Sequence, residues 1–70
     1  MSRFECTDDF GNQSVIEERH HAIAVCRHAL SFLAGYSAPI KKCSESPSGW
    51  LYEALAVGNG KFVYIHVAEI

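Results

Sequence analysis

Cationic side chains are scarce in this chain, and so are long apolar runs. Its 70 residues contain six Lys and Arg against eight Asp and Glu, so the formal net charge is −2. A protein that binds the phosphate backbone of nucleic acid non-specifically needs a basic surface, so this composition argues against that class. No apolar run approaches the ~20 residues of a transmembrane helix. No apolar segment follows Arg3 as it would in a secretory signal peptide, so we expect a cytoplasmic protein.

Cysteine is also sparse. Three cysteines are an odd number and do not make a closed disulfide framework, which favours a reducing compartment. No pair has the C-x-x-C spacing of a zinc site, and no two helical histidines are four apart. We therefore expect no metal and no other cofactor. The residues weighed as metal ligands are Cys6, His20, His21, Cys26, His28 and Cys43.

The composition is that of one small globular domain spanning residues 1–70. Hydrophobic residues make up 49% and charged residues 20%, which excludes a disordered chain. A core of this size usually supplies only about 3–5 kcal/mol of net stability. Proteins this small often gain the remainder from a metal, from disulfides or from association, so the sequence directs attention to an interaction surface.

One helix is predicted over residues 15–34. Ser14-Val15-Ile16-Glu17 fits a capping box, in which the Ser14 hydroxyl and the Glu17 carboxylate each accept from the other residue's amide. No Gly or Pro interrupts the segment before Gly35, which suits a helix C-terminus. Apolar residues at helical spacing, including Ile23, Ala29 and Leu30, predict an amphipathic helix. Its predicted solvent side carries His20, His21, Ala24 and His28.

The C-terminal half predicts a β-meander. Ser46-Pro47-Ser48-Gly49 and Asn59-Gly60 are turn signals, and they separate strands at residues 40–45, 50–57 and 61–68. A weaker alternation at residues 3–7, followed by a turn from Asp8 to Asn12, could add a fourth, edge strand. The predicted fold is therefore α+β, with one amphipathic helix packed on a three-stranded antiparallel meander.

The pairing of the last two strands determines which face meets the helix. A two-residue loop at Asn59-Gly60 would pair Leu55 with Tyr64 and Glu53 with His66. The helix-facing set would then be Trp50, Tyr52, Ala54, Ala56, Val63, Ile65 and Val67, with Cys43 from the preceding strand. A three-residue loop would slip one strand by one residue and place Glu53 in the core, where an unpaired carboxylate is costly.

The opposite sheet face is the predicted interaction surface. Apolar residues surround a row of Lys42, Glu53 and His66, and a single helix cannot cover both sheet faces. Acidic residues in the first 18 positions could steer the chain onto a basic partner. The predicted partner-binding residues are Leu51, Glu53, Leu55, Phe62, Tyr64, His66, Asp8 and Asp9.

Catalysis is not expected. Glu53 and His66 could be neighbours, but Cys43 would point to the other face, and a domain this small rarely encloses a substrate pocket.

The sequence therefore favours a non-enzymatic protein-binding module, an inhibitor or adaptor docking on a larger protein or nucleoprotein complex. Short acidic chains of this kind include phage-encoded anti-CRISPR proteins, an analogy of size and charge alone. The alternatives are a structural homodimer or assembly subunit, and a sheet-based nucleic-acid binder using Trp50, Tyr52, Phe62 and Tyr64.

Overall fold

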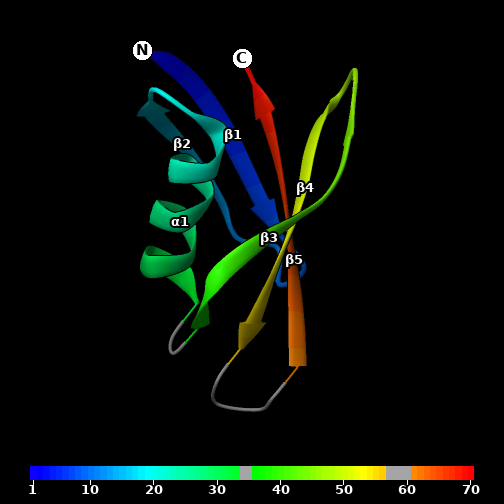
Figure 1. Ribbon diagram of the computed structural model, residues 1–70. Helices are drawn as coiled ribbons and strands as arrows, with labels where there is room; N and C mark the ends of the chain where they lie inside the picture. The colour runs from blue at the N-terminus through cyan, green and yellow to red at the C-terminus, as the bar shows by residue number, and fades with distance from the viewer. Residues whose placement is uncertain (34–35, 57–60) are drawn as a thin grey trace.

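The chain forms an antiparallel β-sheet with one helix on it (Figure 1). A computed structural model describes residues 1–33, 36–56 and 61–70, and the side chains of 1–33, 40–54 and 61–70. In these residues the elements are β1 (Ser2–Asp8), β2 (Gln13–Glu18), α1 (His21–Phe32), β3 (Tyr36–Ser46), β4 (Gly49–Ala56) and β5 (Lys61–Glu69). The α+β class is confirmed, but the described sheet has five strands, not three or four.

The strands lie in the order β2-β1-β5-β4-β3, and all neighbours are antiparallel. An N-terminal hairpin, β1–β2, is joined through the β1–β5 pairing to a C-terminal meander, β3–β4–β5. Residues 3–7 do form a strand, but it lies inside the sheet, between β2 and β5. The two chain termini consequently lie near each other at one end of the molecule (Figure 1), where the Ile70 amide donates to the Arg3 carbonyl oxygen.

Strand β2 was not predicted because residues 13–18 combine an apparent helix cap at Ser14 with the β-branched residues Val15 and Ile16. They form β2 instead of helix, so the predicted capping box of Ser14 and Glu17 is wrong. Six residue pairs with β1 hold this segment extended, and its one buried residue, Ile16, lies opposite Phe4. Six ladder positions with a buried side chain stabilise more than the two hydrogen bonds of a capping box. The helix begins only at His21, with His20 as its N-cap.

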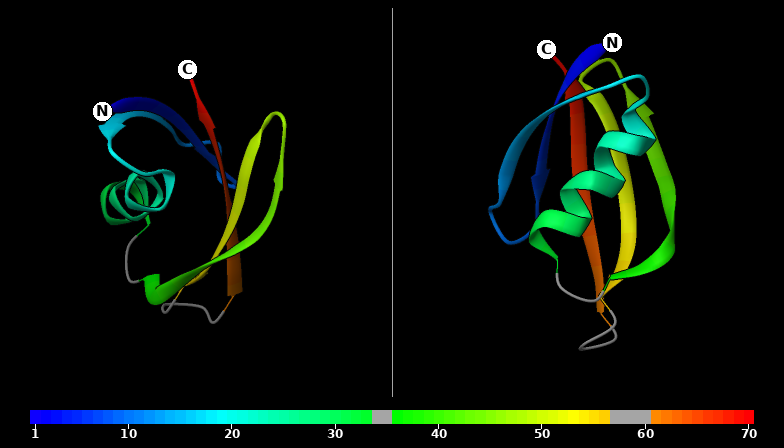
Figure 2. Two further views of the ribbon diagram at one scale, coloured as in Figure 1. Left: turned by 45° about the horizontal axis from the view of Figure 1, so that its top comes forward. Right: turned by 90° about the vertical axis from the view of Figure 1, so that its left-hand side faces the viewer.

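The helix covers one face of the curved sheet (Figure 2). Its buried residues are Ala24, Val25, His28 and Ala29. The predicted helix face is therefore partly wrong: Ala24 and His28 point inward, while Leu30 is 72% exposed. The core also contains Phe4, Cys6, Ile16, Leu33, Tyr52, Val63, Ile65 and Val67. Helix α1 ends at Phe32 with Leu33 as its C-cap, and the predicted helix end at residue 34 and closing Gly35 lie outside the described residues.

The β4–β5 pairing keeps the predicted faces but not the predicted partners. Leu55 pairs with Phe62, and Glu53 pairs with Tyr64 instead of His66. Strands β4 and β5 are separated by four residues, 57–60, which lie outside the described residues together with the predicted Asn59-Gly60 turn. The partners thus differ from the prediction by two residues. A slip of two leaves every side chain on its face, because the side-chain period of a strand is two.

Strand β3 departs from the predicted meander because its pairing with β4 is irregular. Register shifts occur between Ser37 and Lys41 and between Lys42 and Ser44. Lys41 therefore lies opposite Glu53, in the place predicted for Lys42, and Lys42 lies opposite Tyr52 on the helix-bearing side. Cys43, predicted to be helix-facing, is exposed at this bulge.

Candidate functional site

The sheet face opposite the helix carries a cluster of apolar and polar side chains. We call Leu51, Glu53, Phe62, Tyr64 and His66 the outer patch, since they alternate outward along β4 and β5. Phe62 is 57% exposed and Tyr64 is 38% exposed. Within the described residues, Figure 2 shows no element covering this face. Five of the eight predicted partner-binding residues thus lie together on one surface.

Two hydrogen bonds to carboxylates hold Tyr64 in place at the centre of the outer patch. Its hydroxyl donates to Glu53 Oε2 at 3.1 Å, and its backbone amide donates to Asp9 Oδ2 at 2.9 Å. The hydrogen bond to the Glu53 carboxylate, together with its charge, raises the pKa of Tyr64 above the ordinary value. The structure therefore brings a sixth predicted residue, Asp9, beside the patch.

The remaining two predicted residues do not join this surface. The side chain of Leu55 lies outside the described residues. Asp8, predicted to be exposed, has a fully buried side chain on the helix-bearing side. Its Oδ1 accepts from the amides of Phe10 and Asn12, and its Oδ2 accepts from Asn12 Nδ2. Asp8 therefore fixes the β1–β2 turn and is unavailable to a partner.

Asp8 also connects to a buried histidine that sequence reasoning placed on the surface. Asp8 Oδ2 lies 3.0 Å from His28 Nε2, and His28 Nδ1 lies 2.6 Å from Ser14 Oγ. A carboxylate can only accept, so Nε2 carries a hydrogen and, in the neutral ring, Nδ1 accepts from Ser14. The composition matches a Ser-His-Asp triad, but His28 and Asp8 are fully buried. A substrate cannot reach the imidazole, and the network joins β1, β2 and α1.

This network lowers the pKa of Asp8. Burial alone would raise the pKa, but hydrogen bonds from Asn12, His28 and the Phe10 amide outweigh it. The ionised carboxylate is therefore the stable form in the folded protein. One sequence feature could have predicted the hydrogen bonds from the Phe10 and Asn12 amides. It is the aspartate that opens the turn from Asp8 to Asn12, since such side chains accept from nearby backbone amides. Nothing local pointed to His28 as the partner, because it lies 20 residues along the chain.

A cluster of four side chains, His20, His21, Trp50 and Tyr52, lies at the start of α1. The rings of His21 and Trp50 stack with centroids 4.0 Å apart. The centroid of the His20 ring lies 4.1 Å from the centroid of the His21 ring. His21 Nδ1 is hydrogen-bonded to the Tyr52 hydroxyl. Burial, and then the charges of His20 and Lys42, lower the pKa of His21. This shift favours the neutral ring, and the ring packs against Trp50.

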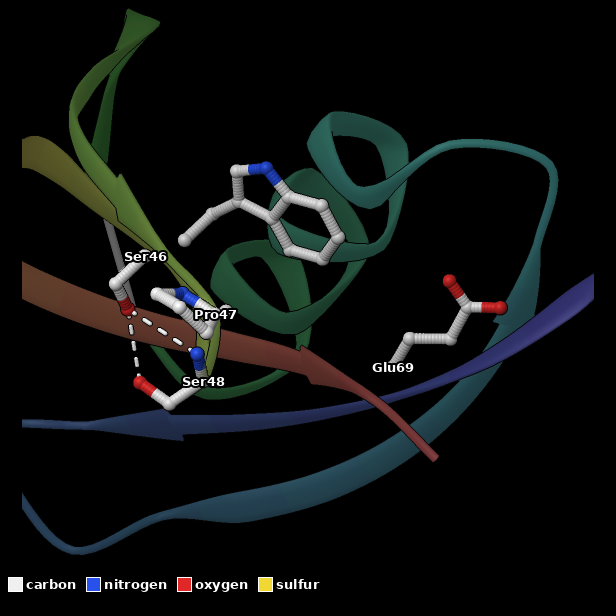
Figure 3. Close-up of a pocket in the computed structure, with 6 residues that line it drawn as sticks. Ser46, Pro47, Ser48 and Glu69 are labelled. Atoms are coloured by element: carbon white, nitrogen blue, oxygen red, sulfur yellow. Dashed lines mark hydrogen bonds between the residues drawn. The ribbon is translucent and has the colours of Figure 1, made fainter.

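A pocket lies next to this cluster, at the end of the sheet. Its volume is about 270 Å³, and its lining residues are Ser46, Pro47, Ser48, Gly49, Trp50 and Glu69. Figure 3 shows the turn residues Ser46, Pro47 and Ser48 on one side and the Glu69 side chain on the other. Gly49 has φ +138° and lies so close to β5 that an added Cβ would be 2.3 Å from the Val67 carbonyl oxygen. No side chain larger than hydrogen therefore fits at this lining position without a shift of β5.

The candidate metal ligands are dispersed. Cys6 is buried and Cys43 is exposed. Burial, with a smaller contribution from the Glu5 charge, raises the pKa of Cys6 to about 11. In the part of the chain that the structure describes, no three His, Cys, Asp or Glu side chains form a group suited to a metal ion.

Comparisons of the chain with protein-family models, curated proteins and solved structures found no match. Among the described residues, no helix combines the length and the apolar character that crossing a membrane requires.

Proposed function

We propose that this protein is a small non-enzymatic protein-binding module whose outer patch docks on a larger protein, as an inhibitor or adaptor. One observation carries the proposal: within the described residues, the sheet has a helix on one face, while aromatic and apolar side chains lie uncovered on the other. Uncovered apolar groups surrounded by polar ones are typical of interaction surfaces.

The charges around the outer patch suggest what kind of partner it fits. Carboxylates of Glu53 and Asp9 flank Tyr64, and Glu5 lies on the same face of β1. Lys41 opposes Glu53, and the exposed Arg3 lies on the same face of β1 as Glu5. These described groups on the outer sheet face therefore comprise three carboxylates and two cations. Opposite charge accelerates and orients protein association. We therefore propose a partner surface with an apolar centre and basic edges, such as a nucleic-acid-binding protein would present.

A pair of substitutions tests this docking surface. Phe62→Glu places a charge on the outer patch at a site that is 57% exposed, whereas Leu30→Glu makes the same change on the solvent side of α1. Each variant should remain folded, because neither side chain is buried. Tagged wild-type and variant proteins would be incubated with nuclease-treated lysate of the source cells, and captured proteins identified by mass spectrometry.

Capture of one stoichiometric protein by the wild type and Leu30→Glu, but not by Phe62→Glu, would support the proposal. Equal capture by all three would place the docking surface elsewhere. A wild type that captures nothing and elutes at twice its monomer mass, with Phe62→Glu eluting as a monomer, would favour the homodimer instead. A partner captured from untreated lysate but not from nuclease-treated lysate would favour the nucleic-acid alternative.

A further inference from the structure

The pocket at the β3–β4 turn is lined by one acidic side chain and by no basic one. Glu69 is its single charged side chain, and it is exposed. Within the described residues, the Glu69 carboxylate makes no hydrogen bond and no ion pair. The nearby Lys42 is already paired, because its Nζ lies 3.1 Å from Glu45 Oε1. A cation bound in the pocket would therefore lie near a carboxylate that no described side chain neutralises.

An aromatic ring in a fixed orientation forms another wall. Trp50 stacks on His21, and its ring meets Phe4 edge to face with centroids 6.3 Å apart. These contacts fix the indole before any ligand arrives, which reduces the entropy lost on binding. The face of an indole carries negative potential and attracts ammonium and guanidinium groups. Trp50 and Glu69 thus favour the same kind of ligand.

The turn adds hydrogen-bond acceptors. Ser46 Oγ and Ser48 Oγ lie 2.8 Å apart, and Ser46 Oγ also accepts from the Ser48 amide at 3.3 Å. Each hydroxyl oxygen has two lone pairs, so the pair keeps acceptor capacity for an N–H donor. No Lys or Arg is among the lining residues. The pocket therefore offers hydrogen-bond acceptors and an aromatic wall, and no cationic side chain lines it.

We propose that this pocket binds an organic cation, an alkylammonium or guanidinium group. Its volume of about 270 Å³ lies below the ~300–1,000 Å³ of typical small-molecule sites. It therefore suits one side-chain tip or a small head group. The site is separate from the outer patch, since Trp50 lies on the helix-bearing side of β4. Its test is independent of the docking proposal.

Trp50 is the sole tryptophan of the chain, so its fluorescence reports on this pocket directly. Choline and N-α-acetyl-lysine methylamide would be titrated separately at constant ionic strength. The uncharged isostere of choline, 3,3-dimethyl-1-butanol, serves as the ligand control. We expect saturable changes with both cations, a shift of the Trp50 indole N–H resonance, and little response to the alcohol. Tighter binding of the lysine derivative would identify a partner's side chain as the source, and tighter binding of choline a free organic cation.

Glu69→Gln removes the charge at an exposed site while retaining the shape of the side chain. We expect it to weaken binding of both cations by about fivefold or more. Glu53→Gln, on the opposite face, removes one carboxylate elsewhere and should leave the affinity unchanged. The proposal is overturned if neither cation saturates the signal by about 50 mM, if the alcohol acts like choline, or if Glu69→Gln and Glu53→Gln bind equally.

Discussion

Replacing Asp8 with asparagine removes the negative charge from the buried network while retaining its size. The amide oxygen can still accept from the Phe10 and Asn12 amides. The amide nitrogen, however, replaces the oxygen that accepts from Asn12 Nδ2 at 2.9 Å and from His28 Nε2 at 3.0 Å. Two charge-assisted hydrogen bonds are therefore lost at a site with no access to water.

The expected cost follows from these contacts. Hydrogen bonds to a charged group contribute about 1.5–3 kcal/mol each, so two of them contribute about 3–6 kcal/mol. A change of tautomer would let His28 accept from the new amide and regain ~1 kcal/mol. The net destabilisation of Asp8→Asn should be about 2–5 kcal/mol, which for a domain this small lowers Tm by at least ~8 °C. Urea denaturation followed by circular dichroism measures it.

The neighbouring residue supplies a matched control. Asp9 is exposed and accepts one hydrogen bond, from the Tyr64 amide at 2.9 Å. In Asp9→Asn the amide oxygen can still accept that bond, so the change in unfolding free energy should stay within ~0.5 kcal/mol. Equal destabilisation by Asp8→Asn and Asp9→Asn would refute the assignment of the buried network.

The same network predicts an acid-dependent loss of stability. The folded pKa of Asp8 is lowered, so the ionised carboxylate stabilises the protein above its unfolded pKa of about 3.9. This stabilisation is lost as the pH falls through the folded pKa. The difference in unfolding free energy between wild type and Asp8→Asn should be constant near neutral pH and narrow below about pH 4. A difference that stays constant down to pH 2 contradicts the mechanism.

Three further outcomes are expected. Gly49→Ala should lower Tm by about 10 °C or more, because its Cβ would lie 2.3 Å from a β5 carbonyl oxygen and its φ is +138°. At pH 8, Ellman's reagent should label exposed Cys43 rapidly and Cys6 only upon unfolding, since burial raises the pKa of Cys6 to about 11. Glu53→Gln should lower the pKa of Tyr64 toward its ordinary value in a spectrophotometric titration, because the carboxylate raises it.

The best sequence predictions were those that depended on short-range chemistry. The turn at Ser46-Pro47-Ser48-Gly49 is present, because proline fixes its own φ and glycine accepts the positive φ found at Gly49, whatever the surrounding fold. The faces of β4 and β5 were also predicted correctly, which placed Phe62 and Tyr64 outward. Alternation is insensitive to a two-residue error in the partners, so the outer patch could be identified although its pairings could not.

Predictions failed where a segment is compatible with two structures. Residues 13–18 begin with an apparent helix cap and contain β-branched Val15 and Ile16, and pairing with β1 selects the strand. That pairing also displaces the start of α1 to His21 and rotates His28 into the core. The choice depends on β1, which pairs with both β2 and β5, and no local window of the sequence contains that information.

The sequence by itself determined the α+β class, the turns at Asp8–Asn12 and Ser46–Gly49 and the alternating faces of the last two strands, since each follows from the conformational preferences of neighbouring residues. Tertiary structure decided the rest. It buried Asp8 against a histidine 20 positions away, moved Lys42 to the helix-bearing side through a bulge, and brought Glu69 to the turn before Trp50. These contacts join residues far apart in the chain, and their free energy comes from long-range packing and pairing that only the complete sheet provides.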